Sequence, residues 1–408
     1  MSESATHILF VDDDPLILQA TRRQLRGRRV AWAADFAESG DSALLMMRDR
    51  PFDVVVTDMH MPGMDGATLL AQVKNRYPAT VRIILSGYSD EETVLRTVGP
   101  AHQYVAKPCD PDALFNTIER AIVLRKLLAN EPLRRLVAGL GNLPTPPTVY
   151  TQLVEELKSN TASPASVAKI ISQDVAMTAQ ILKLTNTSFF SVSFHVSSVL
   201  QAVRLLGFET VQSLVLKLGV FRQLKGGKRI EGVLDRINKQ SLLIGSVARD
   251  IALSENLGSN VADLAFCAGM LSQIGSVVLI DWDADRFLSV IGKCPFDNGA
   301  ADHAAKAVGA CHTQLGGYLL GLWGFSDPVV EAVTCQLRPE YCAGDGLSVL
   351  AVLHAAQALA APMFSGVPLF APLNLDYLSR LGYADQVEHW KKIAETRSGE
   401  VDRDGGAP

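Results

Sequence analysis

The sequence predicts a chain of two parts, an α/β domain built on a parallel sheet and a second domain made only of helices. In the first part, short apolar runs alternate with amphipathic helical patterns between Ile8 and about Leu128. This alternation is typical of parallel strands with helices on both faces of the sheet. In the second part, from Thr148 to about Ala361, helical patterns dominate and strand-like runs are few.

The first domain should contain four well-marked strands and one weaker strand. Each marked strand is a short apolar run followed by a polar or turn-forming loop, as in a buried parallel strand. The runs lie at residues 8–11, 54–57, 83–85 and 104–106, with the weaker one at 30–34. A last helix should begin after Asp110, which is a good N-cap, because Pro111 suits the first helical position. This helix should lead into a helical linker at 126–142.

Two apolar stripes at helical spacing mark helices early in the second domain. Their members are Val167, Ile170, Ile171 and Val175 in the first stripe, and Val199, Ala202, Val203 and Leu206 in the second. Gly207 follows the second stripe and is a natural helix stop. A C-terminal extension at 362–408 is polar after about Arg397, and we expect its end to be disordered.

The composition is that of an ordinary soluble protein. The 408 residues are 48% hydrophobic and 20% charged, with a formal net charge of -5, which does not suggest a general binder of nucleic acid or membrane surfaces. No apolar run approaches the roughly 18 residues that span a bilayer, and the first residues do not resemble a signal peptide. The six cysteines are scattered without a C-x-x-C pair. We therefore expect a cytoplasmic protein with reduced thiols.

Acidic residues follow two of the predicted strands. Asp12, Asp13 and Asp14 come directly after the run at 8–11, and Asp58 closes the run at 54–57. Because parallel strands place their C-terminal ends at one edge of the sheet, these carboxylates should converge there. Carboxylates repel one another unless a cation lies among them, and Mg²⁺ prefers oxygen ligands of this kind. Asp14 is better placed as a helix N-cap than as a ligand.

Two further strands end in groups that complement the acids. Ser86 follows the run at 83–85, and Lys107-Pro108 follows the run at 104–106. Taken in order along some hundred residues, the acid pair, the strand-end aspartate, the hydroxyl and the Lys-Pro pair are a specific combination. Residues 5–125 resemble the receiver domain of two-component response regulators, whose fold is a flavodoxin-like doubly wound sheet.

This resemblance implies a role for each of these residues. Asp58 would accept a phosphoryl group from a sensor histidine kinase or a phosphotransfer protein, with Mg²⁺ bound nearby. The implied metal ligands are Asp12, Asp13, Asp58 and the backbone carbonyl of His60. Ser86 and Lys107 would contact the phosphoryl oxygens. Tyr104 matches the aromatic position that reorients when the hydroxyl residue moves on phosphorylation.

Several segments of the helical half resemble the HD-related output domain, HDOD, over residues 143–361. Leu143-Pro144 opens it, and Val175 stands where the family usually has proline. The other matching segments are residues 182–190, 202–207, 268–275 and 318–325. The resemblance implies an all-α fold similar to that of the HD phosphohydrolases.

The metal ligands of those hydrolases are largely replaced. Their His-Asp doublet falls on Ser272-Gln273, a later histidine falls on Cys335-Gln336, and an early histidine falls on Gln240. Only His312 keeps a ligand-type side chain, and one imidazole does not hold a di-metal centre. His312 is better explained as a hydrogen-bonded interior residue, and we expect no cofactor in this domain. The remaining polar side chains could still form a cleft for a small ligand or peptide.

These observations favour a response regulator with a non-catalytic output domain that acts through protein–protein interaction. The segment at 199–220 is too poor in basic residues for a DNA-reading helix pair. Two alternatives remain open: a metal-dependent phosphohydrolase of cyclic dinucleotides with a nonstandard site, and a nucleotide-binding sensor without turnover. A homodimer through the apolar linker is a further option, and the downstream partner is not identified.

Overall fold

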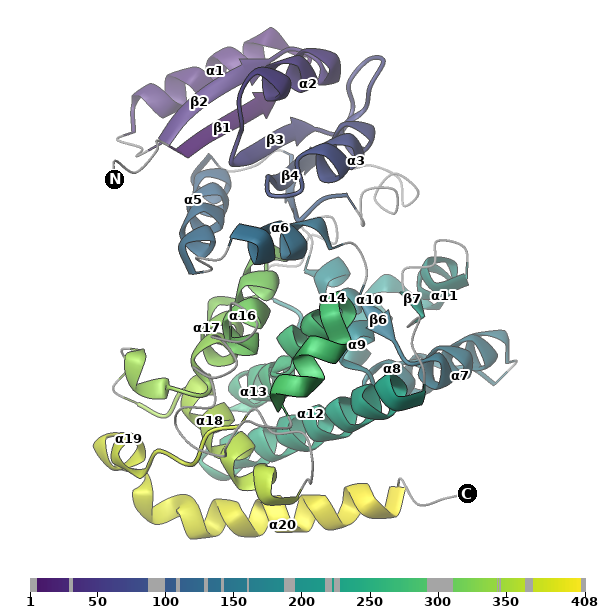
Figure 1. Ribbon diagram of the computed structural model, residues 1–408, viewed down its shortest axis with the longest axis vertical. Coiled ribbons are helices and arrows are strands. Elements are labelled where there is room, and N and C mark those ends of the chain that lie inside the picture. Colours follow the sequence, from purple (N-terminus) through teal and green to yellow (C-terminus); the bar gives the residue numbers. More distant parts are fainter. Residues whose placement is uncertain are drawn as a thin grey trace. The chain divides into compact units, whose positions relative to one another are not determined.

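The computed structural model divides into two compact units, the first made mainly of Met1–Gly141 and the second mainly of the remaining chain (Figure 1). The structure describes residues 6–28, 32–86, 100–107, 111–127, 131–140, 143–159, 161–186, 195–216, 222–223, 228–291, 311–342, 344, 346–363 and 370–404. Every statement below concerns these residues.

The first unit is built on a five-stranded parallel sheet, as predicted (Figure 1). Its strands are β1 (Thr6–Val11), β2 (Trp32–Ala37), β3 (Val54–Asp58), β4 (Val81–Ser86) and β5 (Gln103–Ala106). The spatial order is β2-β1-β3-β4-β5, and every neighbouring pair is parallel. This is the strand order of flavodoxin-like folds, whose ligands bind where the order reverses, beside β1 and β3.

Helices connect the strands, and local capping explains where they begin. They are α1 (Pro15–Arg26), α2 (Gly40–Asp49), α3 (Gly66–Arg76), α5 (Pro111–Leu127) and α6 (Glu131–Gly139). The Asp14 carboxylate accepts a hydrogen bond from the backbone N–H of Leu16 at 2.8 Å, which confirms it as an N-cap. The Asp65 carboxylate caps α3 in the same way, through the N–H of Thr68 at 2.7 Å.

The core of this unit centres on β3, in which all five residues are buried. Alternate strand residues contribute to a cluster with the inner faces of α2 and α3. Its fully buried members include Leu9, Val55, Ala43, Leu69, Leu70, Val73 and Ile84. Because the strand is covered on both faces, only its C-terminal end can present a side chain to a ligand.

Arg82 ties the sheet to the linker helix α6. Its side chain is fully buried at the start of β4, and its guanidinium donates to the carbonyls of Thr80, Pro100 and Ala138 at 3.0, 2.6 and 2.5 Å. A ring nitrogen of His102 also lies 2.8 Å from the Ala138 carbonyl. These bonds satisfy a carbonyl in the last turn of α6, where helix carbonyls lack intrahelical partners.

The second unit is helical. Its principal helices are α7 (Pro147–Lys158), α8 (Pro164–Ile171), α9 (Val175–Thr185), α10 (Val199–Leu206), α11 (Phe208–Leu216), α12 (Lys228–Ser254), α13 (Ser259–Leu271), α14 (Ile274–Ile291), α16 (His312–Leu322), α17 (Asp327–Cys335), α18 (Val349–Ala360), α19 (Leu375–Arg380) and α20 (Val387–Asp404). The short pair β6 (Pro144–Thr145) and β7 (Arg222–Gln223) is parallel. At the crossing of α12 and α13, a Cβ at Gly269 would overlap the backbone of Gly245, so both glycines allow close packing.

The expected disorder of the C-terminal tail is wrong as far as Asp404, because α20 is a helix packed on α12 and α18. Trp390 is fully buried, and its indole N–H donates to the Glu255 carboxylate at 2.8 Å. Arg397, where disorder was expected to begin, pairs with Asp250 through two hydrogen bonds of 2.5 and 3.1 Å. Polar residues near the end of the chain therefore form the outer face of a docked helix.

One helical stretch, Ser259–Ser289, is long and apolar enough to cross a membrane by composition, with a window of mean hydropathy 1.7. The expectation that no such run exists is therefore wrong. Of that window, 83% is buried inside the fold, as is typical of a core helix.

Candidate functional site

Asp58 and Asp12 lie at the C-terminal ends of the neighbouring strands β3 and β1, as predicted. The register pairs Val11 with Thr57, so the two aspartates follow adjacent positions of the sheet. Both are buried, with 8% and 4% of their surface exposed, whereas Asp13 is exposed. Two carboxylates held this far from solvent require a positive charge nearby.

Lys107 supplies that charge. Its Nζ lies 2.9 Å from one oxygen of Asp12 and also forms an ion pair with Asp58. Burial alone would lower the pKa of Lys107, but the hydrogen bonds and negative charges of Asp58 and Asp12 outweigh it, so the pKa is raised. The ammonium therefore bridges the two carboxylates, and the sequence prediction that these three groups converge is met by the geometry.

The loop after β3 holds Asp58 in place. The second carboxylate oxygen of Asp58 accepts a hydrogen bond from the backbone N–H of His60 at 2.9 Å. The loop then returns, since the N–H of Gly66 donates to the carbonyl of Met59 at 2.9 Å. A Cβ at Gly66 would overlap the carbonyl oxygen of Asp58, so this close return requires glycine.

Two further residues predicted for the receiver site, Ser86 and Tyr104, lie on β4 and β5, and the structure tests their placement only in part. Ser86 is the last residue of β4, in register with Ala106, but its side chain lies outside the described atoms. Tyr104 lies on β5 opposite Ile84, and its half-buried ring packs against the core cluster. The switch roles of these two residues remain predictions.

Carboxylate oxygens fit a hard cation such as Mg²⁺. In this chain the donors would be Asp12 and Asp58, with exposed Asp13 beside them and the carbonyl of His60 in the following loop. Within the described residues, no three His, Cys, Asp or Glu side chains are gathered closely enough for a metal site. The positive charge among the buried acids is instead that of Lys107.

The degenerate HD positions of the second unit are mostly buried, and all except Gln240, which is in the middle of α12, lie at helix ends. Gln240 is on α12, Ser272 and Gln273 form the turn between α13 and α14, His312 begins α16, and Gln336 follows α17. Each of these five is less than 5% exposed, and Cys335 is half-buried. A Cβ at Gly275 would overlap the His312 carbonyl, so this glycine brings α14 against α16.

Two of these side chains, those of Ser272 and Gln336, satisfy backbone carbonyls at the end of α13. The Ser272 hydroxyl donates to the Gly269 carbonyl at 2.7 Å, and Gln273 accepts from the Ser276 hydroxyl at 2.8 Å. The Gln336 amide donates to the Ser272 carbonyl at 2.9 Å and thereby joins α17 to the α13–α14 turn. Uncharged groups at former ligand positions thus hold helices together.

His312 differs from its prediction. It is fully buried, but its Nε2 has no hydrogen-bond partner, and its Nδ1 lies 3.7 Å from the sulfur of Cys311. Burial lowers the pKa of His312 to about 3, so the ring is neutral. Among the described residues of the same unit, Ser241 Oγ, Gln336 Oε1 and Gln357 Oε1 are also buried without a partner. Such atoms in a folded protein are usually met by internal water.

Sequence reasoning found no partner for His354, which the structure places in this polar region. Its Nδ1 lies 2.8 Å from the Gln336 carbonyl, and its Nε2 accepts from the backbone N–H of Asn374 at 2.9 Å. Gln357 donates to the same Gln336 carbonyl. The signal was available, because His354 and Gln357 are the polar residues of the otherwise apolar helix α18 and are three positions apart, on one face.

Asp174 is a second buried group that sequence reasoning did not single out. Its carboxylate accepts from the N–H of Met177 at 2.7 Å, the amide of Asn238 at 2.9 Å and the hydroxyl of Thr145 at 3.2 Å. Burial raises the pKa of Asp174 to about 6, although these bonds oppose the shift. Asn238 also accepts from the N–H of Val175, a bond that proline at this position could not make.

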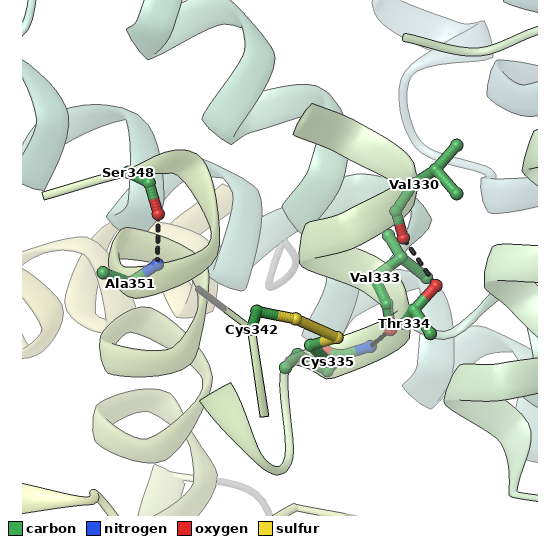
Figure 2. Close-up of a disulfide and its surroundings, with 8 residues drawn as sticks. Val330, Val333, Thr334, Cys335, Cys342, Ser348 and Ala351 are labelled. Carbon is green, nitrogen blue, oxygen red and sulfur yellow. Dashed lines mark hydrogen bonds between the residues drawn. A yellow bond between two sulfur atoms is a disulfide. The ribbon is translucent and has the colours of Figure 1, made fainter. Parts of the chain in front are cut away.

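The expectation that all cysteines are reduced is wrong for one pair, because Cys335 and Cys342 form a disulfide (Figure 2). The two residues are seven positions apart and flank the short 3-10 helix η2 (Pro339–Tyr341). Spacing alone did not reveal them, because a C-x₆-C pair matches neither a zinc motif nor a redox motif.

Comparison with known proteins agrees with this division of the chain. The family model of the response regulator receiver domain matches residues 8–119, and that of the HDOD domain matches residues 143–339. The chain is similar to the hydrogenase transcriptional regulatory protein HoxA of Cupriavidus necator, with 36% identity over 125 residues. It is also similar to the C4-dicarboxylate transport transcriptional regulatory protein DctD of Pseudomonas aeruginosa, with 36% identity over 140 residues.

These similarities are confined to part of each protein. The matched segments cover 30% and 33% of this chain, and 25% and 29% of HoxA and DctD. Among solved structures, the MmoQ response regulator of Methylococcus capsulatus aligns over 61% of this chain and 98% of its own length, with 21% identity and a TM-score of 0.49. The two matching family models and the order in which they occur show that the chain is a two-component response regulator with an N-terminal receiver domain and a C-terminal HDOD domain.

Proposed function

We propose that Asp58 accepts a phosphoryl group in the presence of Mg²⁺ and that its phosphorylation state controls a non-catalytic HDOD domain that acts through protein–protein interaction. The observation that carries this proposal is the bridge from Lys107 to Asp58 and Asp12 at the end of β3. Asp58 supplies a carboxylate nucleophile, and Asp12 is a second acid beside it. Lys107 is a cation that can move its contact from the carboxylate to an added phosphoryl group.

The residues of this site suggest how the transfer proceeds. The phosphorus–nitrogen bond of a phosphohistidine donor breaks as a bond forms between phosphorus and a carboxylate oxygen of Asp58. Bound Mg²⁺ would neutralise phosphoryl charge during this step. The His60 N–H holds one oxygen of Asp58. Lys107 can then exchange its contact with the carboxylate for one with the phosphoryl oxygens, because both are anionic acceptors within reach of one ammonium.

Strand β4 could transmit a change at the phosphorylation site to the linker helix α6. Ser86 ends this strand and Arg82 lies four residues earlier, with its guanidinium on the Ala138 carbonyl of α6. A displacement of Ser86 toward a phosphoryl group would therefore act on a strand that is bonded to the linker. Small shifts in packed elements of this kind can bias two alternative arrangements.

The absence of catalysis in the HDOD domain is part of the proposal. The Gln336 amide and the Ser272 hydroxyl donate to carbonyls at the end of α13, Gln273 accepts from the Ser276 hydroxyl, and His312 is a neutral buried ring. Elemental analysis and turnover of cyclic dinucleotides test this point. Stoichiometric iron or manganese, together with hydrolysis that is lost in His312→Ala, would show instead that the domain is a phosphohydrolase. Equilibrium binding of nucleotides without turnover would support the sensor alternative.

The remaining expectations complete the proposal. The domain limits are 5–125 for the receiver, 126–142 for the linker, 143–361 for HDOD and 362–408 for the extension. The phosphoryl donor is a sensor histidine kinase or phosphotransfer protein, and the protein works in the cytoplasm, without DNA or a membrane as a partner. A pull-down with beryllofluoride-treated and untreated protein should identify the downstream protein. The same experiment tests whether a second copy of the chain is bound as a homodimer.

Intact-mass measurement after treatment with acetyl phosphate and Mg²⁺ tests the acceptor. The wild type should gain one phosphoryl group and Asp58→Asn none. Asp65→Asn is the matched control, because it removes a nearby carboxylate while asparagine can still cap α3. An adduct that persists in Asp58→Asn, or one that is lost in Asp65→Asn, would contradict the assignment.

A further inference from the structure

Figure 2 shows the disulfide between Cys335 and Cys342. Both residues are partly exposed to solvent. Cys335 ends α17, Cys342 follows η2, and both side chains are half-buried. Their Cα atoms are 7.0 Å apart, just above the usual range of about 4.4–6.8 Å for disulfides. The bond joins the end of α17 to the residue after η2 and so closes the turn between them.

The other described cysteines lack this access. Cys267 and Cys311 are buried, and burial raises the pKa of both thiols, that of Cys267 to about 12. A thiol that does not ionise reacts slowly with oxidants and disulfides. Among the cysteines that the structure describes, Cys335 and Cys342 are therefore the ones expected to react with oxidants and disulfides.

The segment closed by this pair is bonded to the interior of the helical unit. Gln336 directly follows Cys335, and its side-chain amide donates to the carbonyls of Ser272 and Val333 at 2.9 and 3.0 Å. Its own carbonyl receives hydrogen bonds from His354 and Gln357 of α18. One residue beside the disulfide therefore connects the ends of α13 and α17 with α18.

This connection is incompletely satisfied. The Oε1 atoms of Gln336 and Gln357 are buried and have no hydrogen-bond partner. A buried acceptor without a partner favours any rearrangement or internal water that satisfies it. A rearrangement around Gln336 that follows release of Cys335 could therefore gain bonds for these two acceptors, which partly offset the bonds that it breaks.

We propose that Cys335 and Cys342 are a reversible redox pair, whose oxidation fixes the turn at 336–342 and thereby sets the position of Gln336 between α13, α17 and α18. The proposal does not depend on phosphorylation of Asp58. The redox pair would let the helical domain respond to a second signal, the ratio of thiols to disulfides in its surroundings. Partly exposed disulfides are the kind that are labile rather than structural.

The oxidant is a low-molecular-weight disulfide such as oxidised glutathione. The thiolate of one cysteine attacks it, forms a mixed disulfide and releases one glutathione thiolate. The second cysteine then attacks the mixed disulfide, forms the bond between Cys335 and Cys342, and releases the second glutathione. Two electrons pass from the protein to the reagent, and the two thiol protons leave to solvent or to the released thiolates.

Hydrogen exchange on the full-length protein tests this proposal. The protein is equilibrated with oxidised glutathione or with dithiothreitol, alkylated with N-ethylmaleimide, and checked for the crosslinked peptide by mass. Oxidation should slow exchange at least about tenfold at Arg338, Tyr341 and Cys342, whose N–H groups bond within the turn. The start of α18 should become more protected as well.

The variants Cys342→Ala and Cys335→Ala should each abolish the difference between the two conditions. Cys267→Ala is the matched control and should retain it, because this buried thiol takes no part. The proposal is overturned if no peptide linking Cys335 and Cys342 forms, or if α18 exchanges equally in both conditions. It is also overturned if the difference survives in both pair variants.

Discussion

Replacing Lys107 by alanine tests whether its ammonium holds the acidic site together. The substitution leaves Asp12 and Asp58, which are 4% and 8% exposed, without their shared counter-charge. Charges about 3 Å apart attract by about 6 kcal/mol at an effective dielectric constant near 20. Desolvation and the lost rotamer freedom of lysine offset most of this attraction. We expect the receiver to lose about 2–4 kcal/mol of stability at pH 7, because two buried acids then repel each other.

The conditions that relieve this repulsion should restore stability. Mg²⁺ should stabilise Lys107→Ala by about 2.7 kcal/mol at a hundredfold excess over its dissociation constant, and should stabilise the wild type by less. A cation among the acids would then do what the ammonium does in the wild type.

Hydrogen exchange of the amides in β1 and β3 measures this locally, without assuming that the two domains unfold together. Arg48→Ala is the control, because Arg48 is an exposed cation on α2 of the same domain. The reasoning fails if Lys107→Ala costs less than about 0.5 kcal/mol, as surface ion pairs often do. It also fails if Mg²⁺ stabilises Lys107→Ala no more than it stabilises the wild type.

Three further predictions concern the linker, the loop and the buried ionisable groups. Arg82→Met should raise amide exchange in α6 at least about tenfold, because the bond to the Ala138 carbonyl is lost, while α2 should not change. Gly66→Ala should cost about 2–4 kcal/mol in denaturant unfolding because its Cβ overlaps Asp58, whereas Gly63→Ala should cost only about 1 kcal/mol through its positive φ. The pKa of Asp174 is raised to about 6 in the folded state, so its contribution of about 3 kcal/mol is present at low pH and is lost as pH rises from about 4 to 6. The pKa of His312 is lowered to about 3, so its contribution of about 5 kcal/mol is lost as pH falls from about 6.5 to 3. Unfolding at several pH values should therefore show a steeper fall toward acid in Asp174→Asn and a shallower one in His312→Asn.

The receiver could be predicted closely from sequence because its signals are local. Apolar runs of three to five residues marked the strands, and even the weak run at 30–34 corresponds in part to β2, which begins at Trp32. The aspartate and lysine of the site follow strand ends, so the parallel topology alone brings them together. The sequence did not reveal that Lys107 bridges both acids, which the structure shows.

The helical domain was less predictable because its polar contacts join residues far apart in the chain. The bond from Asn238 to Asp174 spans 64 positions, and that from Gln336 to Ser272 spans the same number. Helical periodicity shows which face of a helix is buried, but not which polar side chain on another helix it meets. For the same reason the orphaned Nε2 of His312 and the role of His354 could not be inferred from their neighbours in sequence.

The docking of α20 sets the shortest fragment of the second unit that can be expected to fold by itself. The HDOD family model ends at residue 339, yet Trp390 and Arg397 bind partners on or next to α12, the longest helix of the unit. A fragment cut at 361 would uncover the apolar surface that α20 protects on α12 and α18. Such a fragment should aggregate, whereas one that reaches Asp404 keeps its own cover. Expression designs and truncation phenotypes for this chain should therefore be judged against residue 404 rather than against the family boundary.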